Sequence, residues 1–205
     1  LNENMTQPSI PFQTAGTVDI HELVIFTGSG KFLDIKDYMS ELNIYEDIFS
    51  PNMSGNFLFV DSRNLIKELP IVGEEYLYVK IETPSSGQLI EKIFRVYSVT
   101  DREFANDQGT QIYNLNFVSL EAIANTFKPI FKTFKGQISA LVRDIFDDYI
   151  QTKRTAIKKD NAYTFNNDVS KLQILTSTSN AVKFVSPGWT PFKCINWCAS
   201  KSIPL

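Results

Sequence analysis

Histidine and cysteine are scarce in this sequence, which contains one histidine, His21, and two cysteines, Cys194 and Cys198, among 205 residues. A Ser/His/Asp or Cys/His relay needs a histidine as its base, so such a relay could be built only around His21. We interpret His21 as a half-exposed strand residue, and no Gly-x-Ser-x-Gly elbow accompanies it. A structural zinc site takes four cysteine or histidine ligands, more than these spacings provide. We therefore predict no catalytic site, no metal and no cofactor.

Long apolar runs and an export signal are also missing. No run approaches the roughly 20 apolar residues that span a bilayer, and the N-terminus lacks the basic-then-apolar order of a signal peptide. Cys194 and Cys198 lie four residues apart in a segment that looks helical, a spacing that suits two reduced thiols better than a disulfide. The sequence therefore predicts a soluble protein with cytosolic thiols and no membrane insertion.

Positive charge is not in excess, because 20 Lys and Arg residues stand against 23 Asp and Glu residues, a formal net charge of −3. The sequence pI is near 5.3. This balance gives no global attraction to nucleic acid or to an anionic membrane, although it leaves room for local patches.

Two further patterns come close to a site without forming one. Thr27 to Lys31, TGSGK, lacks the glycine and the hydroxyl residue of a phosphate-binding loop, because Ile25 and Phe32 stand at those positions. Adjacent acids can perform acid–base catalysis on a sugar. However, neighbours on a strand point to opposite faces, and neighbours on a helix lie about 100° apart. We interpret the three acid pairs as solvated surface: Glu46 with Asp47, Glu74 with Glu75, and Asp147 with Asp148.

What the first part of the sequence does contain is a series of strand patterns. Phe57, Phe59 and Asp61 alternate with Leu58 and Val60, the period of two typical of a half-buried strand. Pro- and Gly-containing turns separate the segments, and the turn Pro84 to Gly87 joins two long ones as a hairpin. We predict strands over Val18–Thr27, Met39–Phe49, 57–61, Tyr76–Thr83, Leu89–Thr100 and Gln111–Leu120, a short helix over Asn64–Leu69, and a polar loop over Asp101–Thr110.

The second part has helical periodicity. Glu121–Phe127 and Gln137–Thr152 are predicted helices, the latter with a wide apolar stripe. The basic stretch Lys153–Lys159 is interpreted as the solvated end of that helix, with a binding patch as the alternative. One or two short strands are expected between Ala162 and Val185. A last helix begins with Thr190 as N-cap and Pro191 as first residue.

These patterns predict a β-rich α+β fold with three parts. Residues 1–17 form an N-terminal arm, 18–128 an antiparallel β-barrel or sandwich domain, and 129–205 a smaller α/β domain that is incomplete at its C-terminal end. Sixteen Phe, eight Tyr and two Trp exceed the need of one small core. Surplus aromatic residues supply subunit contacts, which favours a structural, assembling protein over an enzyme.

Two motifs carry a family resemblance. The stretch IYEDIFSPNMSGNFLFVDSRNLIKELPIVGEEYLYVKIETP resembles the N-terminal, tail-tube-like barrel of baseplate central hub proteins from contractile-tailed phages of the T-even type. SPGWTPFKCINWCASKSIP, from Ser186 to Pro204, resembles a helix in the domain inserted after that barrel. Together the similarity covers about Val18 to Pro204.

The resemblance implies a virion protein of the phage tail baseplate. In such hubs a homotrimeric ring, with two barrel domains per subunit, joins the tail tube above to the cell-puncturing spike below. DNA passes through the channel without sequence-specific binding, and an acidic lumen would keep it from adhering. Because the chain begins at Leu1 and these hubs are longer, we expect it to be the N-terminal portion of such a protein.

Two other functions stay open at this point. A cell-wall hydrolase of a tail tip would use a carboxylate such as Glu46 or Glu74. A glycan-binding module would stack sugars on exposed aromatic side chains such as Trp189 or Trp197.

Overall fold

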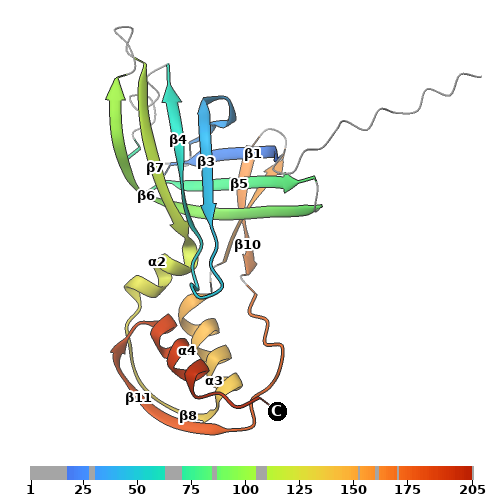
Figure 1. Cartoon of the computed structure of the whole chain (residues 1–205), viewed down its shortest axis with the longest axis vertical. Helices are drawn as coiled ribbons and strands as arrows, with labels where there is room; N and C mark the ends of the chain where they lie inside the picture. The colour runs from blue at the N-terminus through green and yellow to red at the C-terminus, as the bar shows by residue number, and fades with distance from the viewer. Residues whose placement is uncertain are drawn as a thin grey trace, which may run out of the picture.

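The computed structural model describes residues 18–27, 31–62, 71–84, 87–104, 110–151, 153–159, 162–169 and 171–204. Figure 1 shows a curled β-sheet above a lobe of helices and one long β-ribbon. The predicted arm 1–17, the centre of the TGSGK stretch and the predicted helix Asn64–Leu69 lie outside the described residues.

Seven antiparallel strands form the sheet, in the order β2-β1-β5-β6-β7-β4-β3. A 3₁₀ turn, η1 (Lys36–Tyr38), precedes β3. Thr83 pairs with Gln88, so the hairpin predicted around Pro84 to Gly87 is confirmed. The strand bounds are β1 (Asp19–Phe26), β2 (Phe32–Asp34), β3 (Met39–Tyr45), β4 (Ser54–Asp61), β5 (Tyr76–Thr83), β6 (Gln88–Phe104) and β7 (Gln111–Ser119).

The core of the sheet lies on its concave face, because every second residue of the central strands is apolar. In β4 the buried set is Gly55, Phe57, Phe59 and Asp61, which confirms the alternation predicted there. Aromatic rings stack through this core. The ring centroids of Tyr38 and Phe59 lie 5.6 Å apart, and those of Phe59 and Tyr113 lie 5.0 Å apart. Offset ring pairs of this kind stabilise a core beyond their buried area.

The sheet curls but does not close. Within the described residues, β2 pairs only with β1, and β3 pairs only with β4. The predicted barrel is therefore a half-barrel with an open seam beside β3 (Figure 1). The predicted β-rich α+β fold class is confirmed.

A second core organises the lower lobe. It is formed by residues of the β8–β11 ribbon and of two helices, among them Ile130, Phe134, Ile145, Phe184 and Cys194. The lobe elements are α2 (Leu120–Phe127), β8 (Ile130–Gln137), α3 (Ile138–Ile145), the π-helix η2 (Phe146–Ile150), β11 (Ala181–Trp189) and α4 (Pro191–Ser200). The hairpin of β9 (Lys153–Lys159) and β10 (Ala162–Val169) extends from the lobe to the side of the sheet, where β9 contacts β6 (Figure 1).

The last helix begins where the sequence predicts, with Thr190 at the N-cap position and Pro191 at the first turn. However, the Thr190 side chain makes no capping hydrogen bond. Instead, the Phe192 N–H donates to the side-chain oxygen of Asn125 in α2, at 2.8 Å. A helix N-terminus needs such acceptors, and this one comes from the helix that follows the sheet.

Three local predictions are wrong. Lys153–Lys159 is a strand paired with β10 and not the end of a helix. The helix ends before this segment, because it converts to a π-helical turn in which the Gln151 N–H donates to the Phe146 carbonyl. Asp101 to Phe104 continues β6, with a bulge that places Asp101 at φ 54. Gln137 is in β8, and that strand has no alternating pattern that would reveal it, since Phe131 is exposed and only Ile130 and Phe134 are buried.

Candidate interaction surface

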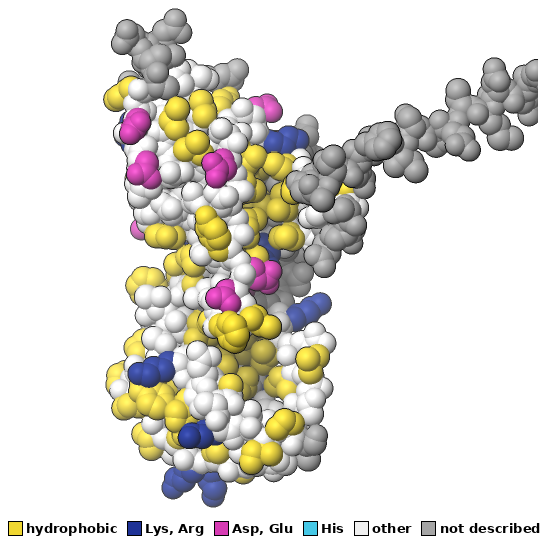
Figure 2. Space-filling view, viewed as in Figure 1, with side chains coloured by type: hydrophobic (Ala, Val, Ile, Leu, Met, Phe, Trp, Pro, Cys, Tyr) yellow, Lys and Arg dark blue, Asp and Glu magenta, His cyan; other side chains and the backbone are white. Residues whose placement is uncertain are grey.

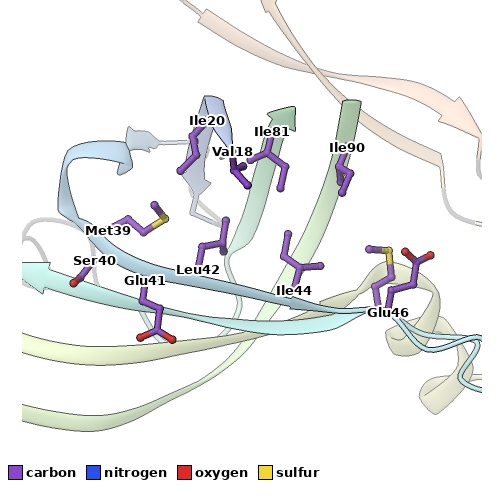
Figure 3. Close-up of a pocket in the computed structure, with 11 residues that line it drawn as sticks. Val18, Ile20, Met39, Ser40, Glu41, Leu42, Ile44, Glu46, Ile81 and Ile90 are labelled. Carbon is purple, nitrogen blue, oxygen red and sulfur yellow. The ribbon is translucent and has the colours of Figure 1, made fainter. Parts of the chain in front are cut away.

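A groove of about 410 Å³ follows the open seam of the sheet. Figure 3 shows that Leu42 and Ile44 of β3 point toward Ile20, Ile81 and Ile90 on the opposite wall. We call this the seam groove. It is lined by Val18, Ile20, Met39, Ser40, Glu41, Leu42, Ile44, Glu46, Met53, Ile81 and Ile90.

The groove exists because β3 is an edge strand. Leu42 and Ile44 face the same side as the buried residues of β4, yet both are only partly buried, whereas Phe57 and Phe59 are fully buried. The apolar floor is thus an unfinished part of the sheet core. Apolar surface gains roughly 25 cal/mol for each Å² removed from water, and an open strand edge offers unpaired backbone groups. The seam is therefore suited to contact another protein surface.

Acidic and apolar side chains surround this groove. Glu46 points along it, while Glu41 points away on the outer side of β3 (Figure 3). The adjoining turn presents Ile48 and Phe49, each 91% exposed. Asp47 holds that turn, since its carboxylate accepts the Phe49 N–H at 2.9 Å. Exposed apolar side chains on an anchored turn beside an apolar groove mark an interaction site.

A second candidate surface lies at the opposite end of the molecule, on the β8–β11 ribbon. Its outer side carries Phe131 and Val185, exposed by 77% and 62%. Lys135 and Lys183 are directly paired across the two strands. We call Phe131, Lys135, Lys183 and Val185 the ribbon face. Like charges placed opposite each other on a ribbon repel.

Charge is divided between the two halves of the chain. Residues 18–128 contain 17 Asp and Glu against 9 Lys and Arg, a formal charge of −8, and residues 129–205 contain 11 Lys and Arg against 5 Asp and Glu, a charge of +6. The β9–β10 hairpin of the second half lies beside the sheet, and residues 153–169 contain four basic and two acidic residues, so the sheet side carries −6 and the lobe +4. On the face in Figure 2, acidic side chains lie over the sheet and its lower turn, and basic side chains gather on the lobe. A modest net charge thus conceals a strong charge dipole.

As predicted, the three acid pairs do not form facing pairs, but the interpretation of all six as solvated surface is wrong for Glu75. Glu74 is exposed and its carboxylate lies 4.0 Å from the Arg95 guanidinium. Glu75 is 2% exposed and accepts three backbone N–H groups, from Val72, Gly73 and Glu74 itself, at 2.8 to 3.0 Å. Its carboxylate therefore organises the turn before β5. Glu46, Asp47, Asp147 and Asp148 are all exposed.

His21 lies on β1 as predicted, and its Nε2 is 2.9 Å from an Oε of Glu82 on the neighbouring strand. Both side chains are exposed by about two fifths, 43% and 39%. No group of three or more His, Cys, Asp or Glu residues that could hold a metal ion occurs in the described part of the chain. Within the same residues, no helix is long and apolar enough to cross a membrane.

The candidate glycan platforms pack against the lobe core. The rings of Trp189 and Trp197 lie 6.4 Å and 4.4 Å from that of Phe184, centroid to centroid. The Lys193 ammonium sits 5.1 Å from the Trp189 ring centroid, in cation–π geometry. Both indoles are partly buried, so packing accounts for them.

A buried polar cluster at the upper end of the sheet was not predicted as a group. Asp61, Gln111 and Tyr113 are at most 5% exposed, and the Arg102 side chain donates to the Gln111 oxygen at 2.8 Å. Burial, with the nearby Asp61 carboxylate, raises the pKa of the Tyr113 hydroxyl well above its ordinary value. Only Asp61 was signalled by the sequence, through its place in the alternation of β4.

Cys194 and Cys198 are free thiols, fully buried in the lobe core, in agreement with the predicted reduced state. Burial raises the pKa of Cys194, although a hydrogen bond with the Ser186 hydroxyl, whose oxygen lies 3.4 Å from the sulfur, works against this. Burial, together with the neighbouring Cys194, raises the pKa of Cys198 to about 11. Thiolates are the reactive species, so neither sulfur is poised for chemistry.

We expect both thiols to resist a maleimide reagent in the folded protein at pH 7 and to react once denaturant is added. In the folded protein both thiols have a pKa above the ordinary value of 9.0. The stability that the two protonated thiols contribute is therefore complete below pH 9, and it is lost as the pH rises toward the pKa of Cys198, about 11. Mass spectrometry after labelling, and thermal melts between pH 8 and 11, measure the two effects. Rapid labelling of the native protein would contradict the buried geometry.

No protein-family model and no curated protein sequence match this chain. Among solved structures, the fold is similar to that of a tail protein from Neisseria meningitidis MC58, with 17% identity over 87% of this chain and 44% of the other, at a TM-score of 0.50. A Francisella PdpA–VgrG complex, half-lidded, matches at a TM-score of 0.36 and 12% identity, over 63% of this chain and 21% of that one. The chain therefore spans less than half the length of the tail protein, with which it shares its fold.

Proposed function

We propose that this chain is a structural component of a phage tail or a related contractile assembly. The observation that carries the proposal is the likeness of 87% of the chain to a solved tail protein. The motifs around β4, β5 and α4 support it, because they resemble the same class of proteins. The finer proposal is a baseplate hub ring, a homotrimer that joins the tail tube to the central spike and stays within the virion.

Three structural features fit such a role. The long strands β5 and β6 can form a wall, and the open seam gives each subunit an unfinished apolar surface. Residues 18–128 carry a formal charge of −8, from 17 acidic against 9 basic residues, which would repel DNA in transit. In this proposal the chain performs no catalytic turnover.

A cryo-electron microscopy map of the assembled tail tests the proposal. We expect three copies of the curled sheet in a ring on the tail axis, between tube and spike. Absence of the chain from the particle, or a place on the periphery, would remove the hub assignment. A peripheral place would still make the protein a tail component, whereas absence from the particle would not.

The two alternatives are tested with the isolated chain. We expect no cleavage of peptidoglycan and no retention on glycan arrays. Cleavage that is lost in Glu46→Gln or Glu74→Gln, with the fold intact, would instead support a cell-wall hydrolase. Glycan binding lost in Trp189→Phe or Trp197→Phe would support a receptor-binding module.

A further inference from the structure

We propose that copies of this chain associate head to tail, with the ribbon face of one copy docked against the seam groove of the next. The inference rests on the proposed function, since it names the contact between subunits of the proposed ring. The occupant of the groove is thus a second copy of the chain.

Charge complementarity is the first argument. The sheet with the β9–β10 hairpin beside it carries −6 and the lobe +4, from the counts given above, so two copies attract when the lobe of one approaches the sheet of the other. At the surfaces themselves, Glu46 points along the groove and Glu41 stands on the outer side of its edge strand β3, while Lys135 and Lys183 stand on the ribbon face. All four side chains are exposed.

The lysine pair is the second argument. Lys135 and Lys183 face each other across the ribbon, and neither takes part in an ion pair within the described residues. In a single copy this arrangement is unfavourable, because like charges directly opposite on a β-ribbon repel. Carboxylates supplied by another copy would relieve it.

Apolar surfaces match as well. Phe131 and Val185 project from the ribbon face, exposed by 77% and 62%. The groove offers Leu42 and Ile44, which belong to the sheet core but are only partly buried. A contact with an apolar centre and charged margins has the composition of a protein interface.

One chain cannot make this contact with itself. Strand β3, which borders the groove, lies in the sheet, and the β8–β11 ribbon lies at the far end of the lobe (Figure 1). The contact joins two different surfaces, so it is heterologous, and repetition of a heterologous contact produces a closed ring or an open filament. A ring is the outcome that the proposed function requires.

Analytical ultracentrifugation of the full chain tests the inference. We expect self-association that weakens as salt is raised from about 0.1 M to 1 M, because exposed charges are then screened. Glu41→Lys with Glu46→Lys, or Lys135→Glu with Lys183→Glu, should each raise the dissociation constant at least about tenfold. The variant with all four reversals should recover association.

The matched control reverses two exposed charges elsewhere, Glu103→Lys with Lys201→Glu. This variant should associate as wild type does.

Several results would overturn the inference. These are a wild-type chain that stays monomeric at about 1 mM in low salt, double variants that associate normally, or a fourfold variant that does not recover. Hydrogen-exchange protection of the groove that depends on residues 1–17, and not on protein concentration, would also overturn it. The occupant of the groove would then be the N-terminal arm and not a second copy.

The failure of this inference is separable from that of the proposed function. A ring seen in the tail with other surfaces in contact would refute the docking mode alone. Charge-dependent association of a chain that is absent from the tail would refute the proposed function alone.

Discussion

Gly55→Ala is expected to destabilise the folded protein by about 3 kcal/mol or more, because the site has no room for a methyl group. A Cβ at Gly55 would lie 2.2 Å from the backbone oxygen of Asn43 and 2.4 Å from the nearest atom of the Phe117 ring. The ring could rotate, but the oxygen belongs to the neighbouring strand β3 and can move only with it. In a chain of this size such a loss lowers the melting temperature by roughly 6 to 12 °C.

Gly87→Ala is the matched control. Gly87 has φ +62, yet nothing lies within 4 Å of a Cβ built there. The expected cost is therefore only the strain of a left-handed alanine, about 1 kcal/mol. Thermal melts of both variants give the comparison. A loss at Gly55 no larger than that at Gly87 would contradict the predicted clash with β3, because Gly55, unlike Gly87, has no positive φ.

Glu75→Ala is expected to cost about 3 kcal/mol, since a buried carboxylate that accepts several backbone N–H groups would be removed and its donors left unpaired. The donors are the N–H groups of Val72, Gly73 and Glu74. Glu75→Gln retains one accepting oxygen and should lie between alanine and wild type. Equilibrium unfolding in urea measures these differences.

The adjacent residue provides the control for that experiment. Glu74 is 78% exposed and lies 4.0 Å from Arg95, so Glu74→Ala should change stability by no more than about 0.5 kcal/mol. A loss of equal size in both variants would mean that the two carboxylates act together. That result would favour Glu74 and Glu75 as a joint acid–base site.

The strands of the sheet were predictable where one side chain in two is apolar. Phe57, Phe59 and Tyr113 show this pattern, and turns with Pro or Gly mark the limits of their strands. The period of two in the sequence reflects a sheet with one face on a core. For this reason the β-rich class and the β5–β6 hairpin followed from the sequence alone.

The lobe was less predictable, for a physical reason. β8 forms a two-stranded ribbon whose buried side chains, Ile130 and Phe134, are four residues apart, a spacing also typical of a helix. Lys153–Lys159 has no apolar stripe, and its structure depends on pairing with β10, a partner that local periodicity cannot reveal. Tertiary pairing overrides local preference in such segments.

The candidate surfaces were the least predictable feature. The acidic and basic halves are visible in the sequence, but their meaning depends on the three-dimensional separation of sheet and lobe. In the sequence, Leu42 and Ile44 have the alternating pattern of ordinary core residues. Only the position of β3 at the end of the strand order leaves them at an open seam.

An open seam also affects how the sheet can adapt its shape. In a closed barrel, strand number and stagger together fix the radius. The half-barrel has no such closure condition, because β2 and β3 do not pair within the described residues. Its curvature can therefore change by a small adjustment of twist between neighbouring strands, with every ladder intact. The open edges of such a sheet can therefore adapt to surfaces of different curvature, which a rigid cylinder could not do.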